Sequence, residues 1–313
     1  MKLTFDRETW YLVGGVISFL LVSSIVGFIL ARRLGGENKT VQNLNSRIKA
    51  WWFMVILFTV AIGTGGIGSL VLFGLTSFLA FREYVTLTPT RPGDHRALFW
   101  SFFVITPLQY YFISISWYGM FIILIPVYAF LFVATLAAVA GDCDKFLERT
   151  AKIHWGLMVC VYCISHAPAL LTLNIPGYEG QNGKLLFFFV LVVQISDVFQ
   201  YIWGKMVGKR KVAPKVSPNK TWEGLIGGVA TSSLIGASLY WATPFSPWMA
   251  GAISFVICVM GFAGGLTMSA IKRDRGVKDY GNLLEGHGGV MDRVDSIAFA
   301  APVFFHLTRY FYA

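Results

Sequence analysis

The chain has 313 residues, of which 56% are hydrophobic, 16% are aromatic and only 13% are charged. A soluble domain would carry about a quarter charged residues, so this composition excludes an ordinary soluble protein and indicates a polytopic membrane protein. The net charge of +10 gives no reason to expect nucleic acid, because basic loops between apolar segments suit a cytoplasmic face and anionic lipid headgroups.

Ten apolar segments follow one another along the chain, and most of them are long enough to cross a bilayer as a helix. We therefore expect an all-α fold, a polytopic helical membrane bundle of about eight to ten transmembrane helices. The first segment lacks a small-residue cleavage site, so we expect a retained helix rather than a signal peptide. The expected spans are about 10–31, 51–64, 66–81, 97–115, 119–140, 154–173, 185–203, 224–243, 248–271 and 297–312.

The second and third segments are short, and the alternative to two spans is a re-entrant pair joined at 63–66. With ten spans, 22 of the 26 Lys and Arg residues fall in loops on one side of the membrane, as the positive-inside rule expects. This arrangement places both chain ends on the non-cytoplasmic side of the membrane. The basic loops are 32–50, 82–96, 141–153, 204–222 and 272–295.

The chemistry of the loops divides the chain into two parts. Residues 1–180 are expected to form an N-terminal transmembrane region whose loops are short and chemically plain. Residues 181–313 are expected to form a C-terminal transmembrane region with two basic loops and an acidic residue inside a membrane segment. We expect the second region to carry the function.

The acidic residue is Asp197, in the seventh apolar segment. An ionised aspartate in hydrocarbon is unfavourable, so such a residue normally faces a cavity or binds a cation. We favour a functional role. The alternative is a neutral or paired aspartate that only fixes helix packing.

The next loop, 204–222, contains six basic residues and is expected to be irregular. It continues into the sequence SPNKTWEG, in which Ser217 or Thr221 could cap the following helix and Glu223 suits the positive end of that helix. A cationic loop beside a helix N-terminus is a natural phosphate site. We favour phosphate binding over a loop that only sets topology.

The last loop, 272–295, combines five basic residues with carboxylates and a glycine-rich stretch around His287. Asp292 and Asp295 are three residues apart and share one helix face if the last helix begins near Val290. Carboxylates near several cations suit a Mg²⁺–phosphate centre, and glycines let a backbone approach a ligand closely. The alternative is a solvated loop with local ion pairs.

Three sequence stretches in this region resemble the signature of phosphatidate cytidylyltransferases, also called CDP-diacylglycerol synthases. They read SAIKR at 269–273, KD at 278–279 and HGGVMDRVD at 287–295. Asp197, the GK pair at 204–205 and SPNKTWEG at 217–224 are similar to other motif elements of this family. Together the motifs cover about residues 190–296 and are long enough to be highly specific.

The resemblance implies transfer of CMP from CTP to phosphatidate, with CDP-diacylglycerol and pyrophosphate as products and Mg²⁺ as cofactor. It implies an integral protein of the bacterial inner membrane with a cytoplasmic active site and access for membrane lipid, and it suggests a homodimer. The implied catalytic residues are Asp292, Lys272, Arg273, Asp279 and His287. The implied metal ligands are Asp292, Asp295 and Asp197. The implied substrate-binding residues are Lys205, Ser217, Lys220, Thr221, Glu223, Ser269, Lys278, Gly288, Gly289 and Arg293.

One position departs from the family pattern. Gly265 stands where the family has an aspartate that shares the metal, and Met268 stands where the family often has a glutamate. This departure favours an alternative, a non-catalytic or impaired membrane paralogue that binds lipid or nucleotide. An ion-coupled transporter is disfavoured, because no inverted repeat is visible. If the chain is an enzyme, Gly265→Asp is expected to raise its rate.

Overall fold

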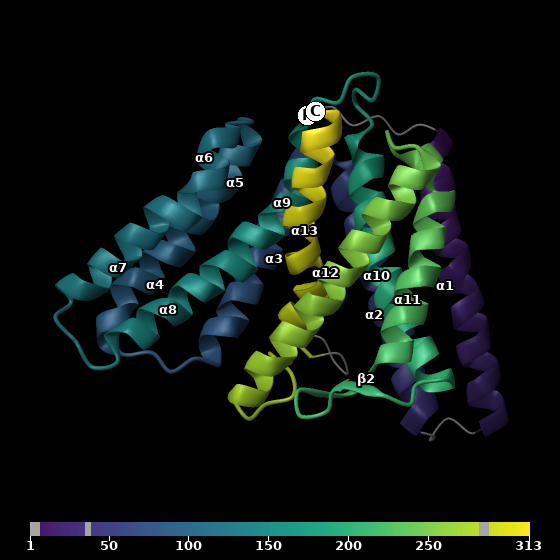
Figure 1. Cartoon of the computed structure of the whole chain (residues 1–313), viewed down its shortest axis with the longest axis horizontal. Coiled ribbons are helices and arrows are strands. Elements are labelled where there is room, and N and C mark those ends of the chain that lie inside the picture. The colour runs from purple at the N-terminus through teal and green to yellow at the C-terminus, as the bar shows by residue number, and fades with distance from the viewer. Residues whose placement is uncertain (1–6, 35–38, 282–287) are drawn as a thin grey trace.

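The computed structural model describes residues 7–34, 39–281 and 288–313, and nearly every element in them is a helix (Figure 1). The α-helices are α1 (Arg7–Leu34), α2 (Lys39–Gly63), α3 (Gly66–Thr86), α4 (His95–Trp100), α5 (Thr106–Ser114), α6 (Tyr118–Ile123), α7 (Phe130–Val139), α8 (Phe146–Gly156), α9 (Ile164–Ala169), α10 (Asn182–Met206), α11 (Trp222–Ser238), α12 (Pro247–Asp274) and α13 (Met291–Tyr312). The strands are β1 (Lys211–Ala213) and β2 (Ser217–Thr221).

Several short helices are parts of longer rods. The π-helical segments η2 (Ser101–Ile105), η3 (Leu124–Ala129) and η4 (Leu157–Cys163) join α4 to α5, α6 to α7 and α8 to α9. Pro107 follows the first of these segments and Pro126 lies within the second. A proline removes one backbone donor, and a wider π turn is one way for a helix to continue past it. The 3-10 segments are η1 (Pro92–Asp94), η5 (Leu170–Thr172) and η6 (Tyr240–Ala242).

Seven of these rods are long and apolar enough to cross a membrane, within the part of the chain that the structure describes. The predicted fold class, a helical membrane bundle, is therefore confirmed. The seven segments are Arg7–Arg33, Gly66–Thr86, Pro92–Ser114, Tyr118–Val139, Phe146–Thr172, Asn182–Met206 and Pro247–Asp274.

The other three predicted spans also contain helices, but these are shorter or more polar. Only Ile48–Gly63 of α2 is apolar, α11 has 17 residues, and α13 carries three charged residues in its first two turns. Helices α2 and α3 have 25 and 21 residues. A bilayer requires about 20 residues, so their lengths favour two separate helices over a re-entrant pair.

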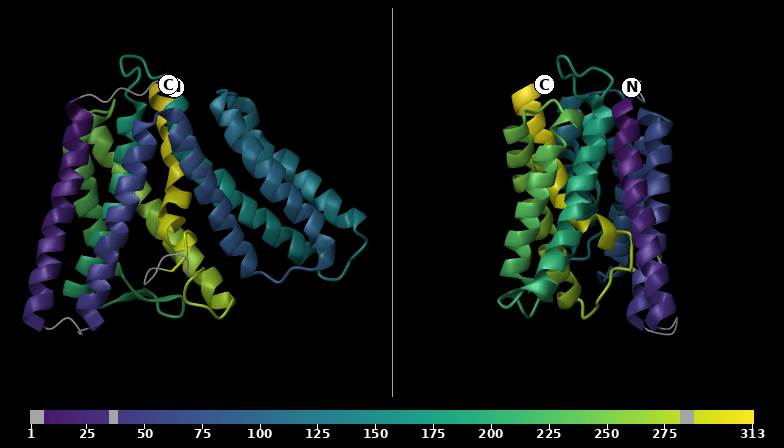
Figure 2. Two further views of the ribbon diagram at one scale, coloured as in Figure 1. Left: turned by 180° about the vertical axis from the view of Figure 1, so that it is seen from behind. Right: turned by 90° about the vertical axis from the view of Figure 1, so that its right-hand side faces the viewer.

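The rods form a main bundle with an arm on one side (Figure 1). Helices α10, α11, α12 and α13 pack in sequence against one another, and α1 and α2 lie on the outer side of the bundle (Figure 2). Helices α4 to α8 form the arm, and α3 and α9 connect it to α13. The last helix therefore contacts both parts of the molecule.

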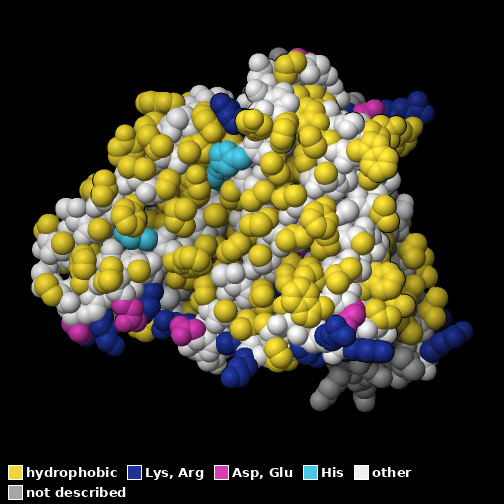
Figure 3. Space-filling model, viewed as in Figure 1, with side chains coloured by type: hydrophobic (Ala, Val, Ile, Leu, Met, Phe, Trp, Pro, Cys, Tyr) yellow, Lys and Arg dark blue, Asp and Glu magenta, His cyan; other side chains and the backbone are white. Residues whose placement is uncertain are grey.

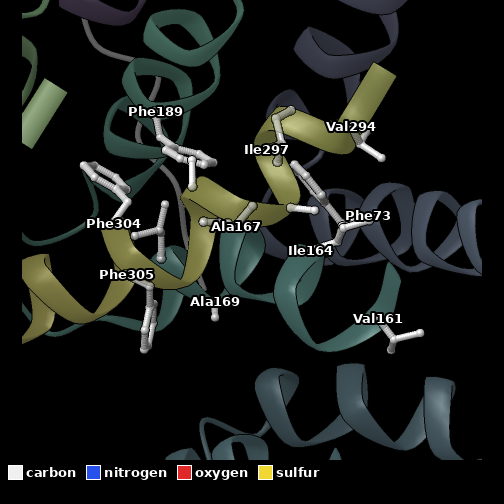
Figure 4. Packing of buried hydrophobic residues seen from close by; sticks show 14 of the residues in the cluster. Phe73, Val161, Ile164, Ala167, Ala169, Phe189, Val294, Ile297, Phe304 and Phe305 are labelled. Atoms are coloured by element: carbon white, nitrogen blue, oxygen red, sulfur yellow. The ribbon is translucent and has the colours of Figure 1, made fainter. Parts of the chain in front are cut away.

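Aromatic side chains fill the interior around α13. Phe304 stacks on Phe189 of α10 with ring centroids 5.0 Å apart, and Phe305 packs against Phe121 at 5.8 Å. Figure 4 shows Phe304 beside Phe189, and Phe305 pointing away from Phe189. Such buried rings contribute a large apolar area to helix packing, so α13 is anchored over its C-terminal half.

Basic side chains mark one edge of the molecule. Figure 3 shows Lys and Arg gathered along the lower edge of the face in view, below a surface that is mostly hydrophobic. The β1–β2 hairpin and the end of α12 lie at this edge and the start of α13 lies in the same half of the molecule, whereas α1 begins and α13 ends at the opposite edge (Figures 1 and 2). This arrangement agrees with the sidedness that the charges of the sequence predict.

Candidate active site

A hairpin precedes α11, in the loop 204–222 that was expected to be irregular. Strands β1 and β2 pair antiparallel, with Lys211 opposite Thr221 and Ala213 opposite Ser217. Thr221 rather than Ser217 caps α11, because its hydroxyl accepts a hydrogen bond from the Gly224 amide at 3.1 Å. The expectation of an irregular loop was wrong, and the hairpin fixes where the basic residues of this loop point.

Glu223 holds the base of the hairpin. Its carboxylate accepts hydrogen bonds from the backbone amides of Lys209, at 3.0 Å, and Arg210, at 3.1 Å. The chain also passes close to α10 here, since a Cβ atom on Gly224 would lie 2.7 Å from the carbonyl oxygen of Gln200. Glu223 therefore positions the phosphate-binding candidates around it through backbone contacts.

Asp292 and Lys272 form a buried ion pair between α13 and α12. The Lys272 ammonium lies 2.6 Å from Oδ1 of Asp292, and both side chains are largely buried. The other carboxylate oxygen, Oδ2, accepts hydrogen bonds from the amides of Tyr280, at 2.8 Å, and Gly289, at 2.9 Å. Gly288 has a φ of +79° and no room for a Cβ atom, which would lie 2.7 Å from Asp292 Oδ2. The first cluster thus consists of Lys272, Asp292 and two loop amides.

Glu83 of α3 supports this cluster from the N-terminal part of the chain. Its carboxylate accepts hydrogen bonds from the backbone amides of Val290 and Met291, each at 2.9 Å, and the residue is only 9% exposed. A carboxylate suits the unpaired amides and positive dipole of a helix N-terminus. Glu83 belongs to none of the motifs that single out the other site residues, although it is a carboxylate next to an apolar span and, like Asp197, needs a partner.

A second cluster brings Asp197 of α10 close to Asp295 of α13. The Ser296 hydroxyl donates to Asp197 Oδ2 at 2.8 Å and lies 3.4 Å from Asp295 Oδ1. The Ser296 amide donates to the same Asp295 oxygen at 2.8 Å. Two carboxylates from different helices therefore share one serine.

Lys220 of β2 supplies the positive charge of this second cluster. Its ammonium donates to the Phe262 carbonyl at 3.4 Å and lies 4.6 Å from the centroid of the Phe262 ring. Burial lowers the pKa of Lys220, whereas the charges of Asp197 and Asp295 oppose that effect. The lysine is thus held beside the carboxylate pair by a carbonyl, an aromatic face and electrostatic attraction.

Gly265 faces the same cluster from α12. A Cβ atom built on Gly265 would lie 2.7 Å from the Lys220 ammonium nitrogen, 3.7 Å from Asp295 Oδ2 and 3.7 Å from the Ser296 hydroxyl. A side chain at position 265 would therefore enter the space that Lys220 occupies. Ser269, one turn later, directs its hydroxyl back to the Gly265 carbonyl at 2.6 Å.

The remaining predicted site residues lie around these clusters. Arg273 is exposed and donates to the carbonyls of Val216, at 3.3 Å, and Val277, at 2.9 Å. The Gln194 side chain donates to the carbonyl of Arg293 at 3.3 Å. His287 lies outside the described residues. Three further candidates are exposed at the basic edge, namely Lys205, Lys278 and Asp279.

The three predicted metal carboxylates are divided between the two clusters. Residues 7–34, 39–281 and 288–313 contain no group of three His, Cys, Asp or Glu side chains arranged to hold a metal ion. Asp292 is engaged by Lys272, whereas Asp197 and Asp295 offer two carboxylates beside a hydroxyl. This donor set fits Mg²⁺, which commonly takes one or two protein carboxylates and completes its shell with water and substrate phosphates.

The arrangement is suited to polyanionic substrates at a membrane surface. Two lysines lie beside carboxylates on α13, and an exposed basic edge surrounds them. Cations shielded from water in this way interact strongly with phosphate groups, because the surrounding protein screens them less than water does.

Comparisons with known proteins agree with this chemistry. The model of the cytidylyltransferase family matches residues 45–311. Uncharacterized protein YnbB of Escherichia coli (strain K12) is 42% identical over 295 residues, which cover 93% of each chain. The phosphatidate cytidylyltransferase of Brucella melitensis biotype 1 is 32% identical over 273 residues, covering 85% of this chain and 93% of that protein. The phosphatidate cytidylyltransferase of Staphylococcus aureus (strain COL) is 31% identical over 197 residues, covering 60% and 76%. The family match includes both Glu83 and Asp292.

Proposed function

Since the chain belongs to the cytidylyltransferase family, we propose that it transfers CMP from CTP to phosphatidate and forms CDP-diacylglycerol and pyrophosphate. The observation that carries the proposal is the pair of lysine–carboxylate clusters at the entrance of α13, on the basic edge of a membrane protein. Relatives named phosphatidate cytidylyltransferase, at 31–32% identity, support the choice of substrates.

In the proposed reaction, a phosphate oxygen of phosphatidate attacks the α-phosphorus of CTP, and the bond to pyrophosphate breaks. A phosphate monoester is largely dianionic near neutral pH, so the nucleophile needs no strong base. The main barrier is repulsion between two polyanions, which fixed positive charges reduce. Lys272 and Lys220, backed by the basic hairpin, are the side chains that supply those charges in this chain.

We further propose that the reaction uses Mg²⁺ and takes place on the cytoplasmic side of the bacterial inner membrane. Asp197 and Asp295 are the residues that would hold the ion, and Mg²⁺ would neutralise phosphate charge when bound. The cytoplasmic assignment rests on the basic edge, since positive loops are retained in the cytoplasm. Membrane-embedded helices around the site give phosphatidate access from the lipid.

The test is a transfer assay with the full chain purified in detergent, using labelled CTP, phosphatidate and Mg²⁺. We expect CDP-diacylglycerol and pyrophosphate in equal amounts. Asp292→Asn should lower the rate at least about a hundredfold, because the Lys272 charge loses its anionic partner and the side chain keeps only one acceptor oxygen for Lys272 and the two loop amides. Asp274→Asn is the matched control, because that aspartate lies at the end of α12 with its side chain 67% exposed. Equal rates in both variants would contradict the proposal.

A second candidate function is favoured by Gly265, which leaves the second cluster with two carboxylates. In this case the protein binds CTP or phosphatidate without turnover. Binding of labelled CTP by wild type and by Gly265→Asp, with no product from either while an active phosphatidate cytidylyltransferase works alongside, would support this candidate instead.

A further inference from the structure

The ammonium group of Lys220 occupies a position built for a cation. It is surrounded by the Phe262 carbonyl, the face of the Phe262 ring and the charges of Asp197 and Asp295. Carbonyl oxygens, carboxylates and aromatic faces all attract positive charge. These groups come from α10, α12 and α13, whereas the lysine itself comes from the β2 strand.

Gly265 makes this position available to Lys220. Because the nearest side-chain atom to a Cβ at position 265 would be the Lys220 ammonium, at 2.7 Å, even a small side chain would force the lysine to move. The same Cβ would lie 3.7 Å from Asp295 Oδ2. The absence of a side chain at this position therefore lets one protein cation approach the carboxylate pair.

We infer that Lys220 is a tethered competitor for the divalent metal at Asp197 and Asp295. In the ligand-free protein its charge neutralises part of the carboxylate pair, so that a metal ion alone binds weakly. When a nucleotide is present, its phosphates give Lys220 another anionic partner, and metal and nucleotide bind together. The second part of this inference rests on the proposed function, whereas the competition itself depends only on the contacts of Lys220.

The competition is tested by Mn²⁺ binding to the purified full chain without nucleotide, followed by electron paramagnetic resonance. Lys220→Met keeps the length of the side chain and removes its charge, so Mn²⁺ should bind at least about tenfold more tightly than to wild type. Lys215→Met is the matched control, because Lys215 is an exposed lysine of the same loop, and it should leave Mn²⁺ affinity unchanged. Adding Asp197→Asn to Lys220→Met should abolish the gain.

A second variant keeps the inference testable if Lys220→Met does not fold. Lys220→Gln removes the charge of the side chain but keeps a hydrogen-bond donor for the Phe262 carbonyl. Tighter Mn²⁺ binding than in Lys215→Gln would support the competition. Unchanged or weaker Mn²⁺ binding in folded Lys220→Met or, in its place, in folded Lys220→Gln would overturn it.

The nucleotide-dependent part has a separate readout. In wild type, CTP should tighten Mn²⁺ binding, whereas in Lys220→Met the same addition should have a smaller effect. If Lys220→Met binds Mn²⁺ tightly but CTP changes the Mn²⁺ affinity of neither protein, the competition is supported. In that case the proposal that CTP binds at this site is wrong.

Discussion

At the first turn of α13, the Glu83 carboxylate bonds to two amides that have no partner within their own helix. Those amides belong to Val290 and Met291, directly before Asp292. The position of Asp292, and with it the Lys272 ion pair, therefore depends on a residue that touches neither. Glu83 is a positioning residue for the first cluster.

Glu83→Gln is expected to lower the free energy of unfolding by about 1–2 kcal/mol, because the charge-assisted cap becomes a neutral one. The rate of CMP transfer should fall as well, because the first turn of α13, which carries Asp292, is held less firmly. Thermal unfolding in detergent and the transfer assay measure the two effects. Glu148→Gln is the control, since Glu148 is exposed and pairs with Lys152 on its own helix. A melting temperature equal to that of wild type would contradict the capping role.

At position 265, the added carboxylate of Gly265→Asp would lie next to Lys220 and near Asp295. We expect this variant to transfer CMP faster than wild type at low Mg²⁺, because three carboxylates hold a divalent ion better than two. Gly265→Asn has nearly the same volume and no charge, so it should not share the gain. Rates measured across a Mg²⁺ titration distinguish the two variants, and equal rates would show that the glycine does not limit activity.

At the scale of elements, the loops of the arm are held by one buried arginine. Arg149 of α8 contacts Asp94 at 3.1 Å and Asp142 at 2.8 Å, and it donates to the Asp144 carbonyl at 2.6 Å. The side chains of Arg149 and Asp94 are 5% and 2% exposed. These contacts fix the connections before α4 and before α8 to each other at the basic edge.

Arg149→Met is expected to destabilise the protein by about 3–5 kcal/mol, because it leaves the Asp94 carboxylate buried without its partner. The double variant Arg149→Met/Asp94→Asn should recover part of this loss, since no buried charge then remains. Lys152→Met, which removes an i,i+4 pair on the helix surface, should change stability by less than about 0.5 kcal/mol. Thermal unfolding of wild type, Asp94→Asn and these three variants gives the comparison, and additive losses in the double variant would contradict the coupling.

The sequence predicts where the helices lie along the chain better than it predicts which helices pack against one another. Long apolar runs and motif residues locate α10, α12 and α13 and the importance of Lys272 and Asp292, because hydrophobic length and charge are local properties. Lipid-facing and buried helix faces are both apolar, so the same pattern does not show which helices pack together. The contact of Glu83 with α13 and the approach of Lys220 to Gly265 both depend on this tertiary packing. The β1–β2 hairpin was missed because prolines and lysines gave no strand alternation.

At the scale of the whole molecule, the basic edge predicts how the protein lies in the membrane. Cys143 lies in the connection between α7 and α8 at this edge and is exposed, whereas Cys160 and Cys258 are buried and Cys163 is partly buried. A natural thiol therefore marks the side on which we propose that the active site faces the cytoplasm.

A membrane-impermeant maleimide should label Cys143 in inside-out vesicles and not in right-side-out vesicles. The reason is that positive loops stay in the cytoplasm, and the other thiols are shielded by helix packing. Mass spectrometry of the labelled protein identifies the modified residue, and Cys143→Ser is the control for background labelling. Labelling of Cys143 in right-side-out vesicles would reverse the proposed orientation.

The bond between Glu83 and the start of α13 also has a consequence for biosynthesis. Glu83 is made about 207 residues before its backbone partner Val290, so it enters the membrane region long before that partner exists. Until α13 is made, the carboxylate lacks these two backbone donors and must be solvated at the membrane surface. The packing of α3 against α13 and the first cluster around Asp292 are therefore completed together, once α13 is in place.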